Sequence, residues 1–387
     1  MRFSVDAHAI GRHLTGNEVY VRNLLHGFAA LDQTSEFIAY LSSNVNGAAA
    51  AVPDRFVRRH VSGNSFLRLG VELSRLLRED APDLLHVQYT APLACPVPVV
   101  VSVHDISFLE HPEYFPWQRA LQLRITVKRT MEGAARVLTP SEFSRTTILQ
   151  SYKLDPARVQ VVPIAVSPIF RPMAQEVAKA SVNGRFGFSE PFVVTVGDLQ
   201  PRKNQLGLIE AFERLLTENP NLPHHLVIVG KDTWFSSRVH ARATQSPFAS
   251  RIHFTGWVTD EDLVQLYNAS DLLAFPSFYE GFGLPILEAM ACGRAVVCSN
   301  TSAMPEVADS AALLFNPAET GEVVRAMRDL LLDSELRARM ERLGQQRASL
   351  FTWERTARRT LEIYYEVAGK KKGAAVGSRK DVRVIRA

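Results

Sequence analysis

Hydrophobic residues in the second half of the chain fall into short continuous runs, separated by longer stretches of helical periodicity. Runs without polar alternation are typical of strands buried on both faces of a parallel sheet. Apolar residues that recur every three or four positions predict helices between them. The expected strands are 192–196, 226–229, 252–255, 272–275 and 295–298, and the expected helices are 205–217, 262–269 and 285–291.

The first half repeats this order with longer insertions. Alternating strands and helices predict a doubly wound α/β sheet in each half, with ligands bound outside the carboxyl ends of the strands. Segment 167–190, with its prolines and the Asn183-Gly184 pair, is predicted to be a linker. The expected strands are 3–6, 37–41, 84–87, 97–103, 136–139 and 159–162, and the expected helices are 19–31, 65–79, 117–133 and 142–152.

Length and charge support two domains and a basic tail. A chain of 387 residues is too long for one ordinary core. The net charge is +4, but residues 369–387 hold seven Lys or Arg against Asp381, which is +6 and leaves −2 for the remainder. The basic pI is therefore a property of the tail, and no nucleic-acid-binding body is expected. The tail is either a solvated terminus or a contact to anionic lipid.

The cysteines and the first residues bear on the compartment. Three cysteines without a C-x-x-C pair support neither a disulfide framework nor a zinc site. The chain opens on an expected strand instead of a signal peptide, and no apolar run approaches the length of a membrane span. A cytoplasmic protein is expected.

The segment from Glu280 to Glu288 carries the most specific chemistry. It places two carboxylates around a glycine-rich turn that enters a helix, with Pro285 at a first-turn position. Backbone N–H groups before such a helix favour a phosphate, and the two glutamates can accept hydrogen bonds from sugar hydroxyls on either side of it. A capped helix is the competing interpretation. The predicted phosphate-binding N–H groups belong to Gly281, Phe282, Gly283 and Leu284.

A second loop, 197–204, follows the first expected strand of this half and contains Arg202 and Lys203. Cations at that position suit a diphosphate, although a solvated basic turn has the same composition. Asp260-Glu261-Asp262 resembles a metal-binding D-x-D, but it follows Thr259 directly before a helix, so capping explains it and no metal is predicted.

Two sites in the first half are candidates. His104 and Asp105 end a strand and are predicted to face the ligand, although a lone histidine is more often structural. Gly16 opens the helix 19–31 and either allows close approach of a ligand or lies in an ordinary cap formed by Thr15 or Asn17.

The expected helix around residues 117–131 mixes apolar and basic residues. Such a helix either lies on an anionic membrane surface or buries one face and solvates its charges, and both alternatives stay open. Its residues of interest are Trp117, Leu121, Leu123, Ile125, Val127, Arg119, Arg124, Lys128 and Arg129.

Taken together, these motifs resemble the retaining glycosyltransferases of family 4, which have the GT-B architecture of two facing Rossmann-like domains with a cleft between them. The resemblance runs from the first strand to about Tyr365. It includes, besides the motifs above, Thr139-Pro140-Ser141-Glu142-Phe143-Ser144, Val162-Pro163-Ile164-Ala165-Val166 and Pro305-Glu306-Val307-Ala308. The family often has Gly-Gly where this chain has Thr15-Gly16, and Asn-Gly where it has Ile164-Ala165.

The resemblance implies transfer from a nucleoside-diphosphate sugar without metal or other cofactor, with retention of the anomeric configuration. It implies that Glu280 contacts the donor sugar, Glu288 the ribose, Arg202 and Lys203 the diphosphate, and that His104 lies beside the sugar ring. The implied divisions are an acceptor-side domain (1–170), a donor-nucleotide domain (171–350), a helix crossing back to the first domain (351–368) and the basic tail (369–387).

The expected function is hexose transfer to a saccharide or lipid-linked acceptor in surface polysaccharide or glycolipid synthesis. The segments His104-Asp105-Ile106-Ser107 and His111-Pro112-Glu113 look like the mannosyltransferase branch, which favours GDP-mannose. A nucleotide-sugar 2-epimerase of the same architecture and a non-catalytic nucleotide-sugar-binding protein are the alternatives. A dehydrogenase is disfavoured because no G-x-G-x-x-G follows either first strand.

Overall fold

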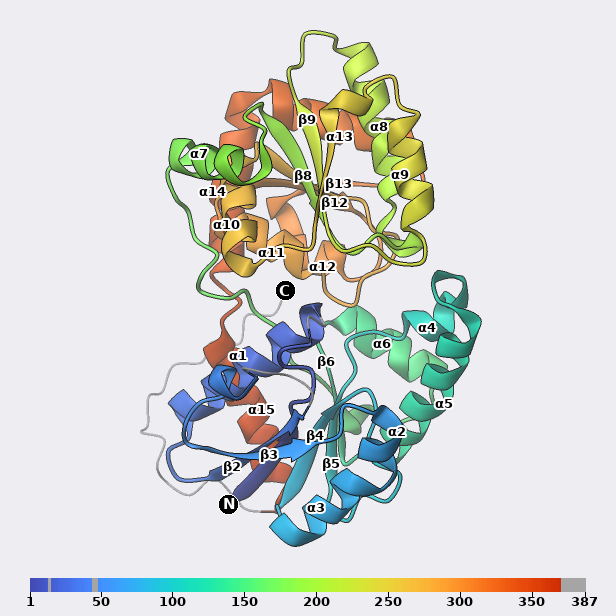
Figure 1. Ribbon diagram of the computed structural model, residues 1–387, viewed down its shortest axis with the longest axis vertical. Helices are drawn as coiled ribbons and strands as arrows, with labels where there is room; N and C mark the ends of the chain where they lie inside the picture. Colours follow the sequence, from blue (N-terminus) through green and yellow to red (C-terminus); the bar gives the residue numbers. More distant parts are fainter. Residues whose placement is uncertain (13–14, 44–47, 370–387) are drawn as a thin grey trace. The chain divides into compact units, whose positions relative to one another are not determined.

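The structure, a computed structural model, describes residues 1–12, 15–43 and 48–369. Within these residues the strands form two sheets (Figure 1). The chain divides into two compact units. The first consists of Met1–Val101, Gly133–Arg136 and Ala357–Ala387, and the second of Ser102–Glu132 and Val137–Thr356.

The first sheet has seven strands within the described residues, in the order β3-β2-β1-β4-β5-β6-β7. β1 pairs in parallel with β2 and β4, β2 with β3, and β6 with β7. The strands are β1 (Arg2–Asp6), β2 (Glu36–Ser42), β3 (Phe56–Val61), β4 (Leu84–Gln88), β5 (Val99–Ser102), β6 (Arg136–Thr139) and β7 (Val159–Val161). The helices of the same part of the chain are α1 (Thr15–Leu31), α2 (Ser65–Leu67), α3 (Leu73–Asp80), α4 (Ser107–Glu110), α5 (Trp117–Gly133) and α6 (Glu142–Ser151).

The second sheet has six strands within the described residues, in the order β10-β9-β8-β11-β12-β13, all paired in parallel. They are β8 (Phe192–Val196), β9 (His225–Val229), β10 (Ile252–Gly256), β11 (Leu272–Phe275), β12 (Ala295–Ser299) and β13 (Leu313–Phe315). The helices are α7 (Gln175–Phe186), α8 (Gln205–Glu218), α9 (Ser236–Thr244), α10 (Asp260–Ala269), α11 (Leu284–Ala291), α12 (Met304–Ala308), α13 (Thr320–Leu332) and α14 (Ser334–Ala348), and α15 (Trp353–Val367) follows.

Both faces of the second sheet are covered, as its unpatterned apolar strands predict. Phe192 and Val194 belong to one buried cluster and Val193, between them, to the other, because successive side chains of a strand point to opposite faces. Residues of α7 and α10 join the first cluster, and residues of α8 and α9 join the second. Figure 1 shows these two pairs of helices on opposite faces of the sheet.

Helix α15 closes the core of the first unit. The ring of Tyr364 packs against Phe3 and Phe28, with centroids 5.2 and 5.3 Å away, and its hydroxyl lies 2.6 Å from Nδ1 of His86. The hydroxyl of Tyr365 donates to Asp32 Oδ2 at 2.6 Å. The last described helix therefore packs on the first strand.

Several elements differ from the sequence-based expectation, among them α7, β3 and β13, and helices α9, α12, α13 and α14 were not predicted. Segment 167–190, predicted to be a linker, contains helix α7, which buries Ala178 and Val182 and ends at Gly187 with a left-handed φ of 77°. Asn183-Gly184 lies inside that helix and marks no turn. Strands β3 and β13 were not predicted, because both are edge strands with few buried positions.

Candidate functional site

Two loops meet at the carboxyl ends of β8 and β11, which are neighbours in the second sheet. Lys203 Nζ lies 2.6 Å from Glu280 Oε1, and Arg202 Nη1 lies 2.9 Å from Glu280 Oε2. Arg202 Nη1 also donates to the carbonyl of Tyr279 at 3.1 Å. The sequence predicted all three charged residues as site residues, and the structure brings them together as one ion cluster of Arg202, Lys203 and Glu280.

Burial makes this ion cluster strongly interacting. Burial alone would raise the pKa of Glu280. The charges of Arg202 and Lys203 outweigh burial and lower this pKa to about 2. Burial lowers the pKa of Lys203, and the Glu280 carboxylate opposes that shift. Glu280 is therefore ionised at neutral pH, and its charge is balanced by cations from the other loop.

Local backbone geometry explains how Lys203 reaches this position. Gly197, directly after β8, has a φ of 152°, and a Cβ there would lie 2.9 Å from Lys203 Cε. The absent side chain makes room for the lysine stem, whose Nζ lies 5.0 Å from the centre of the Phe275 ring. Asn204 then starts α8 by accepting from the N–H of Gly207 at 3.3 Å.

The turn before α11 is held from outside by two serines. The carbonyl of Gly281 accepts from Ser141 Oγ at 2.7 Å and from Ser144 Oγ at 3.1 Å. A Cβ on Gly281 would overlap the carbonyl oxygen of His104, so this residue must be glycine. Gly283 has a left-handed φ of 97°. Within the described part of the chain, the N–H groups of Gly281, Phe282 and Gly283 donate no hydrogen bond to the protein, so they are available to an anion.

The backbone of His104 thus lies against the glycine turn. Burial lowers the pKa of His104 to about 4, so its imidazole is neutral at neutral pH. Asp105 has a local role: its Oδ1 accepts from the N–H and the hydroxyl of Ser107, at 2.9 and 2.6 Å, and so starts α4. The carbonyl of His104 also accepts from Ser144 Oγ at 3.1 Å.

Glu288 lies on α11 and is buried. Its Oε2 accepts from the Tyr267 hydroxyl, which comes from α10, at 2.9 Å. Burial raises the pKa of Glu288 to about 7. The two glutamates of the motif therefore have opposite environments: Glu280 is paired with cations, whereas Glu288 is set to release its proton near neutral pH.

The remaining predicted residues lie elsewhere. Gly16 is exposed in the first turn of α1, in the first unit, with open space around its Cα. Phe282 is buried and packs against Phe351, with ring centroids 5.7 Å apart. Leu284 is the first residue of α11. Asp260, Glu261 and Asp262 form the first turn of α10, where Thr259 Oγ1 accepts from the N–H of Asp262 at 3.2 Å.

Sequence reasoning did not assign several residues that shape the site. Ser141 and Ser144 belong to the segment 139–144 of the family resemblance, but no role was predicted for them. They hold the glycine turn through its Gly281 carbonyl. Ser302 accepts the N–H of Glu280 at 3.0 Å, and Tyr279 donates to Glu110 at 3.0 Å. The spacing of the serines, as N-cap and third helical residue of α6, was the available signal.

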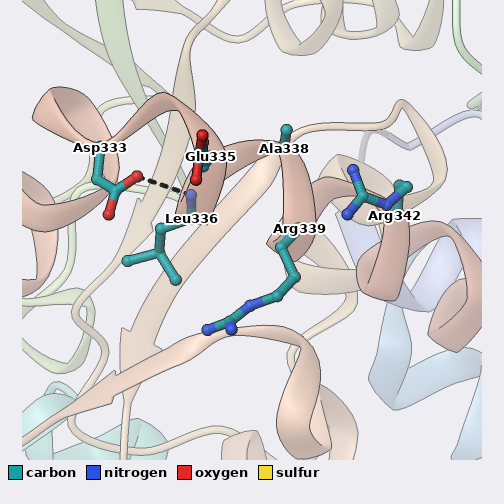
Figure 2. A pocket seen from close by; sticks show the side chains of 6 residues that line it. All are labelled: Asp333, Glu335, Leu336, Ala338, Arg339 and Arg342. Carbon is teal, nitrogen blue, oxygen red and sulfur yellow. Dashed lines mark hydrogen bonds between the residues drawn. The ribbon is translucent and has the colours of Figure 1, made fainter.

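A hollow of about 530 Å³ lies along α14, away from the ion cluster (Figure 2). The hydrogen bond from the N–H of Leu336 to Asp333, 2.9 Å long, caps this helix. The hollow is lined by Asp333, Glu335, Leu336, Ala338, Arg339 and Arg342, none of which was predicted as a site residue.

No helix in the described part of the chain is both long and apolar enough to cross a bilayer.

Two family models match the chain. The model described as Glycosyltransferase Family 4 matches residues 14–168, and the model described as Glycosyl transferases group 1 matches residues 182–347. The Escherichia coli O-antigen chain mannosyltransferase B is 31% identical over 265 residues, which cover 68% of this chain and 69% of that protein. The chain belongs to glycosyltransferase family 4.

Two more similarities define what this family-4 glycosyltransferase shares with its relatives. The serotype-specific mannosyltransferase WbdA of Escherichia coli is 26% identical over 79% of this chain, but the match spans only 39% of WbdA. The structure of Anabaena HepE in complex with UDP and glucose has a TM-score of 0.77 and 20% identity, and it covers 95% of this chain and 100% of that one. The predicted GT-B fold of two α/β domains is confirmed.

Proposed function

We propose that this chain is a retaining glycosyltransferase that moves a hexose from a nucleoside-diphosphate sugar to a saccharide or lipid-linked acceptor. The product would be a surface polysaccharide or glycolipid. Two relatives are named as mannosyltransferases, one of them for the O-antigen chain, which supports GDP-mannose as the first donor to test. HepE, which has the same fold, was solved with UDP and glucose, so UDP-sugars are the second class to test.

The ion cluster is the observation that carries this proposal. Arg202 and Lys203 are partly buried cations that share one buried carboxylate. A diphosphate entering beside the free N–H groups of Gly281, Phe282 and Gly283 would compete with Glu280 for both cations. The released carboxylate could then accept a hydrogen bond from a hydroxyl of the donor sugar. One exchange of partners would thus bind both halves of the donor, and Glu288 would accept from the ribose.

The proposed chemistry needs no nucleophile from the protein. The acceptor oxygen attacks the anomeric carbon on the side from which the diphosphate leaves, and the bond between that carbon and the β-phosphate oxygen breaks. The electron pair stays on the phosphate, which takes the proton of the acceptor hydroxyl. Arg202 and Lys203 stabilise the charge that develops on the leaving group, a task that a metal ion performs elsewhere, so the proposed transfer is metal-independent. The backbone of His104 lies against the glycine turn, and its neutral imidazole is the proposed neighbour of the sugar ring.

The alternatives, a nucleotide-sugar 2-epimerase and a non-catalytic nucleotide-sugar-binding protein, find no support in these relatives. On the proposed function the enzyme works in the cytoplasm, at the inner face of the membrane. An epimerase would form its product without an acceptor, and a binding protein would bind the donor without consuming it. Activity that requires both donor and acceptor separates the proposal from both.

Thermal unfolding with GDP-, UDP- and ADP-sugars tests the donor assignment. A true donor at 100 times its Kd stabilises the protein by about 2.7 kcal/mol, which raises Tm by roughly 5 to 11 °C. Arg202→Ala should remove most of that shift, whereas Arg339→Ala, which changes an exposed arginine on α14, should keep it. If no nucleotide sugar shifts the unmodified protein, or if Arg202→Ala leaves the shift unchanged, the diphosphate assignment is wrong. Retention is tested by the anomeric configuration of the product, measured by NMR.

A further inference from the structure

Helix α5 presents large apolar side chains to solvent. Trp117 is 71% exposed, Leu121 49% and Ile125 60%. The opposite face of the helix is buried through Ala120, Val127, Thr130 and Met131. Core packing therefore uses one side of α5 and leaves a second apolar surface outside. Exposed side chains of this size gathered on one helix are typical of an interaction surface.

The three exposed residues form one stripe. They are spaced four positions apart, and at about 100° per residue they fall within about 80° of the helix circumference. On the same projection Arg124 lies on one side of the stripe, Lys128 within it and Arg129 on the other side. We call these six residues, Trp117, Leu121, Arg124, Ile125, Lys128 and Arg129, the α5 face.

Charge and shape favour one kind of partner. The α5 face carries three cations, and Lys128 lies 3.8 Å from Glu132 as an exposed pair. Exposed pairs of this kind contribute little, so the lysine can exchange its partner. A hollow of about 460 Å³ is lined by five of the six residues together with Glu132. A stripe of Trp and aliphatic residues bordered by Lys and Arg matches the boundary between acyl chains and anionic headgroups.

We infer that the α5 face docks the enzyme on an anionic lipid bilayer. The apolar stripe enters the interface, and Arg124, Lys128 and Arg129 contact lipid phosphates. This inference deepens the proposed function and rests on it, since a lipid-linked acceptor is presented at such a surface. On this inference α5 buries one face in the protein and presents a second face to lipid.

Flotation of the full chain with vesicles tests the inference. The chain should float with phosphatidylcholine vesicles that contain roughly a third phosphatidylglycerol, but not with vesicles of phosphatidylcholine alone. Binding should weaken as the salt concentration is raised. Arg124→Gln with Lys128→Gln should weaken binding about 30-fold, from the usual contribution of a basic residue near an anionic surface. Trp117→Ala should weaken binding at every salt concentration, since it removes apolar contact.

Two controls make the test specific. Arg339→Gln with Arg342→Gln removes an equal charge from α14 and should leave binding unchanged (Figure 2). A chain that ends at Gly369 lacks the basic tail and should still bind. The inference is overturned if the chain does not float, if the α14 variant weakens binding as much as the α5 variant, or if loss of the tail alone abolishes binding.

The outcome can be separated from that of the proposed function. The α5 variants should keep the thermal shift with the donor, because α5 does not contribute to the ion cluster. A protein that floats but shows no donor shift contradicts the proposed function. A protein that shows the donor shift but does not float contradicts the docking inference.

Discussion

Replacing Glu280 by Gln should destabilise the free enzyme and tighten its binding of nucleoside diphosphate. The pKa of Glu280 falls from 4.5 to about 2 in the folded protein. At about 1.4 kcal/mol per pKa unit, its charged form contributes about 3 kcal/mol. The amide keeps the shape but removes the carboxylate that two partly buried cations share, so Tm should fall by roughly 6 to 12 °C at pH 7.

The sign of the pH dependence follows from the lowered pKa. The contribution of Glu280 is complete above about pH 4.5, the pKa of the unfolded chain, and is lost as the pH falls towards 2. The difference in Tm between Glu280→Gln and the unmodified protein should therefore be constant from pH 6 to 8 and shrink in acid. Thermal unfolding followed by circular dichroism at several pH values measures it.

Ligand binding should change in the opposite direction to stability. In the unmodified protein a diphosphate must take Arg202 and Lys203 from Glu280, whereas in the variant both cations are available. If about half of the 3 kcal/mol is lost when the diphosphate enters, the affinity for GDP or UDP should rise about tenfold. Transfer should still be lost, because the amide no longer presents a carboxylate to the sugar. Calorimetric titration with the free nucleotide measures the first effect, and product formation the second.

Glu335→Gln is the matched control, since it neutralises an exposed carboxylate on α14. It should change neither Tm nor nucleotide affinity. The reasoning is refuted if Glu280→Gln unfolds at the temperature of the unmodified protein, or if it binds nucleoside diphosphate equally or more weakly. The first result would mean that the Glu280 charge does not stabilise the fold, and the second that the cations of the ion cluster do not bind the diphosphate.

Two further predictions concern the glycine turn and the second glutamate. Gly281→Ala should destabilise the protein by more than about 2 kcal/mol, since the new Cβ overlaps the His104 carbonyl. The control Gly184→Ala, in an open position of α7, should stabilise the protein by about 0.5 to 1 kcal/mol. Equal effects of the two substitutions in urea unfolding would contradict the packing of the turn. Burial raises the pKa of Glu288 from 4.5 to about 7, so its charge costs stability increasingly as the pH rises through that window. Glu288→Gln should therefore gain Tm relative to the unmodified protein between pH 5 and 7.5, and a pH-independent difference would argue against the raised pKa.

The alternating architecture could be predicted because its signals are local. Runs such as 192–196 and 272–275 are apolar at every position, and they became central strands with both faces covered. β3 escaped prediction because it carries Arg58, Arg59 and His60 along an edge. Helix α7 escaped because a proline before it and Asn183-Gly184 within it have the composition of a linker, whereas tertiary burial of Val182 stabilises the helix.

The sequence indicated the residues of the ion cluster one by one, but not their pairing. Arg202, Lys203 and Glu280 were each assigned from the loop in which they occur. Their contact with one another joins positions far apart in sequence, and it depends on β8 and β11 being neighbours in the sheet. The opposite pKa shifts likewise depend on other elements: cations from another loop lower the pKa of Glu280, and burial raises the pKa of Glu288. No pattern within residues 280–288 contains that information.

The packing of α15 sets an order for biosynthesis. Phe3 and Phe28 are covered by Tyr364, and Asp32 binds Tyr365, so the first strand receives its last neighbours from the far end of the chain. A ribosome makes the first strand early and these tyrosines late. The apolar face around Phe3 must therefore wait, uncovered, until the tyrosines have emerged. A premature stop before Tyr364 would leave that face permanently open.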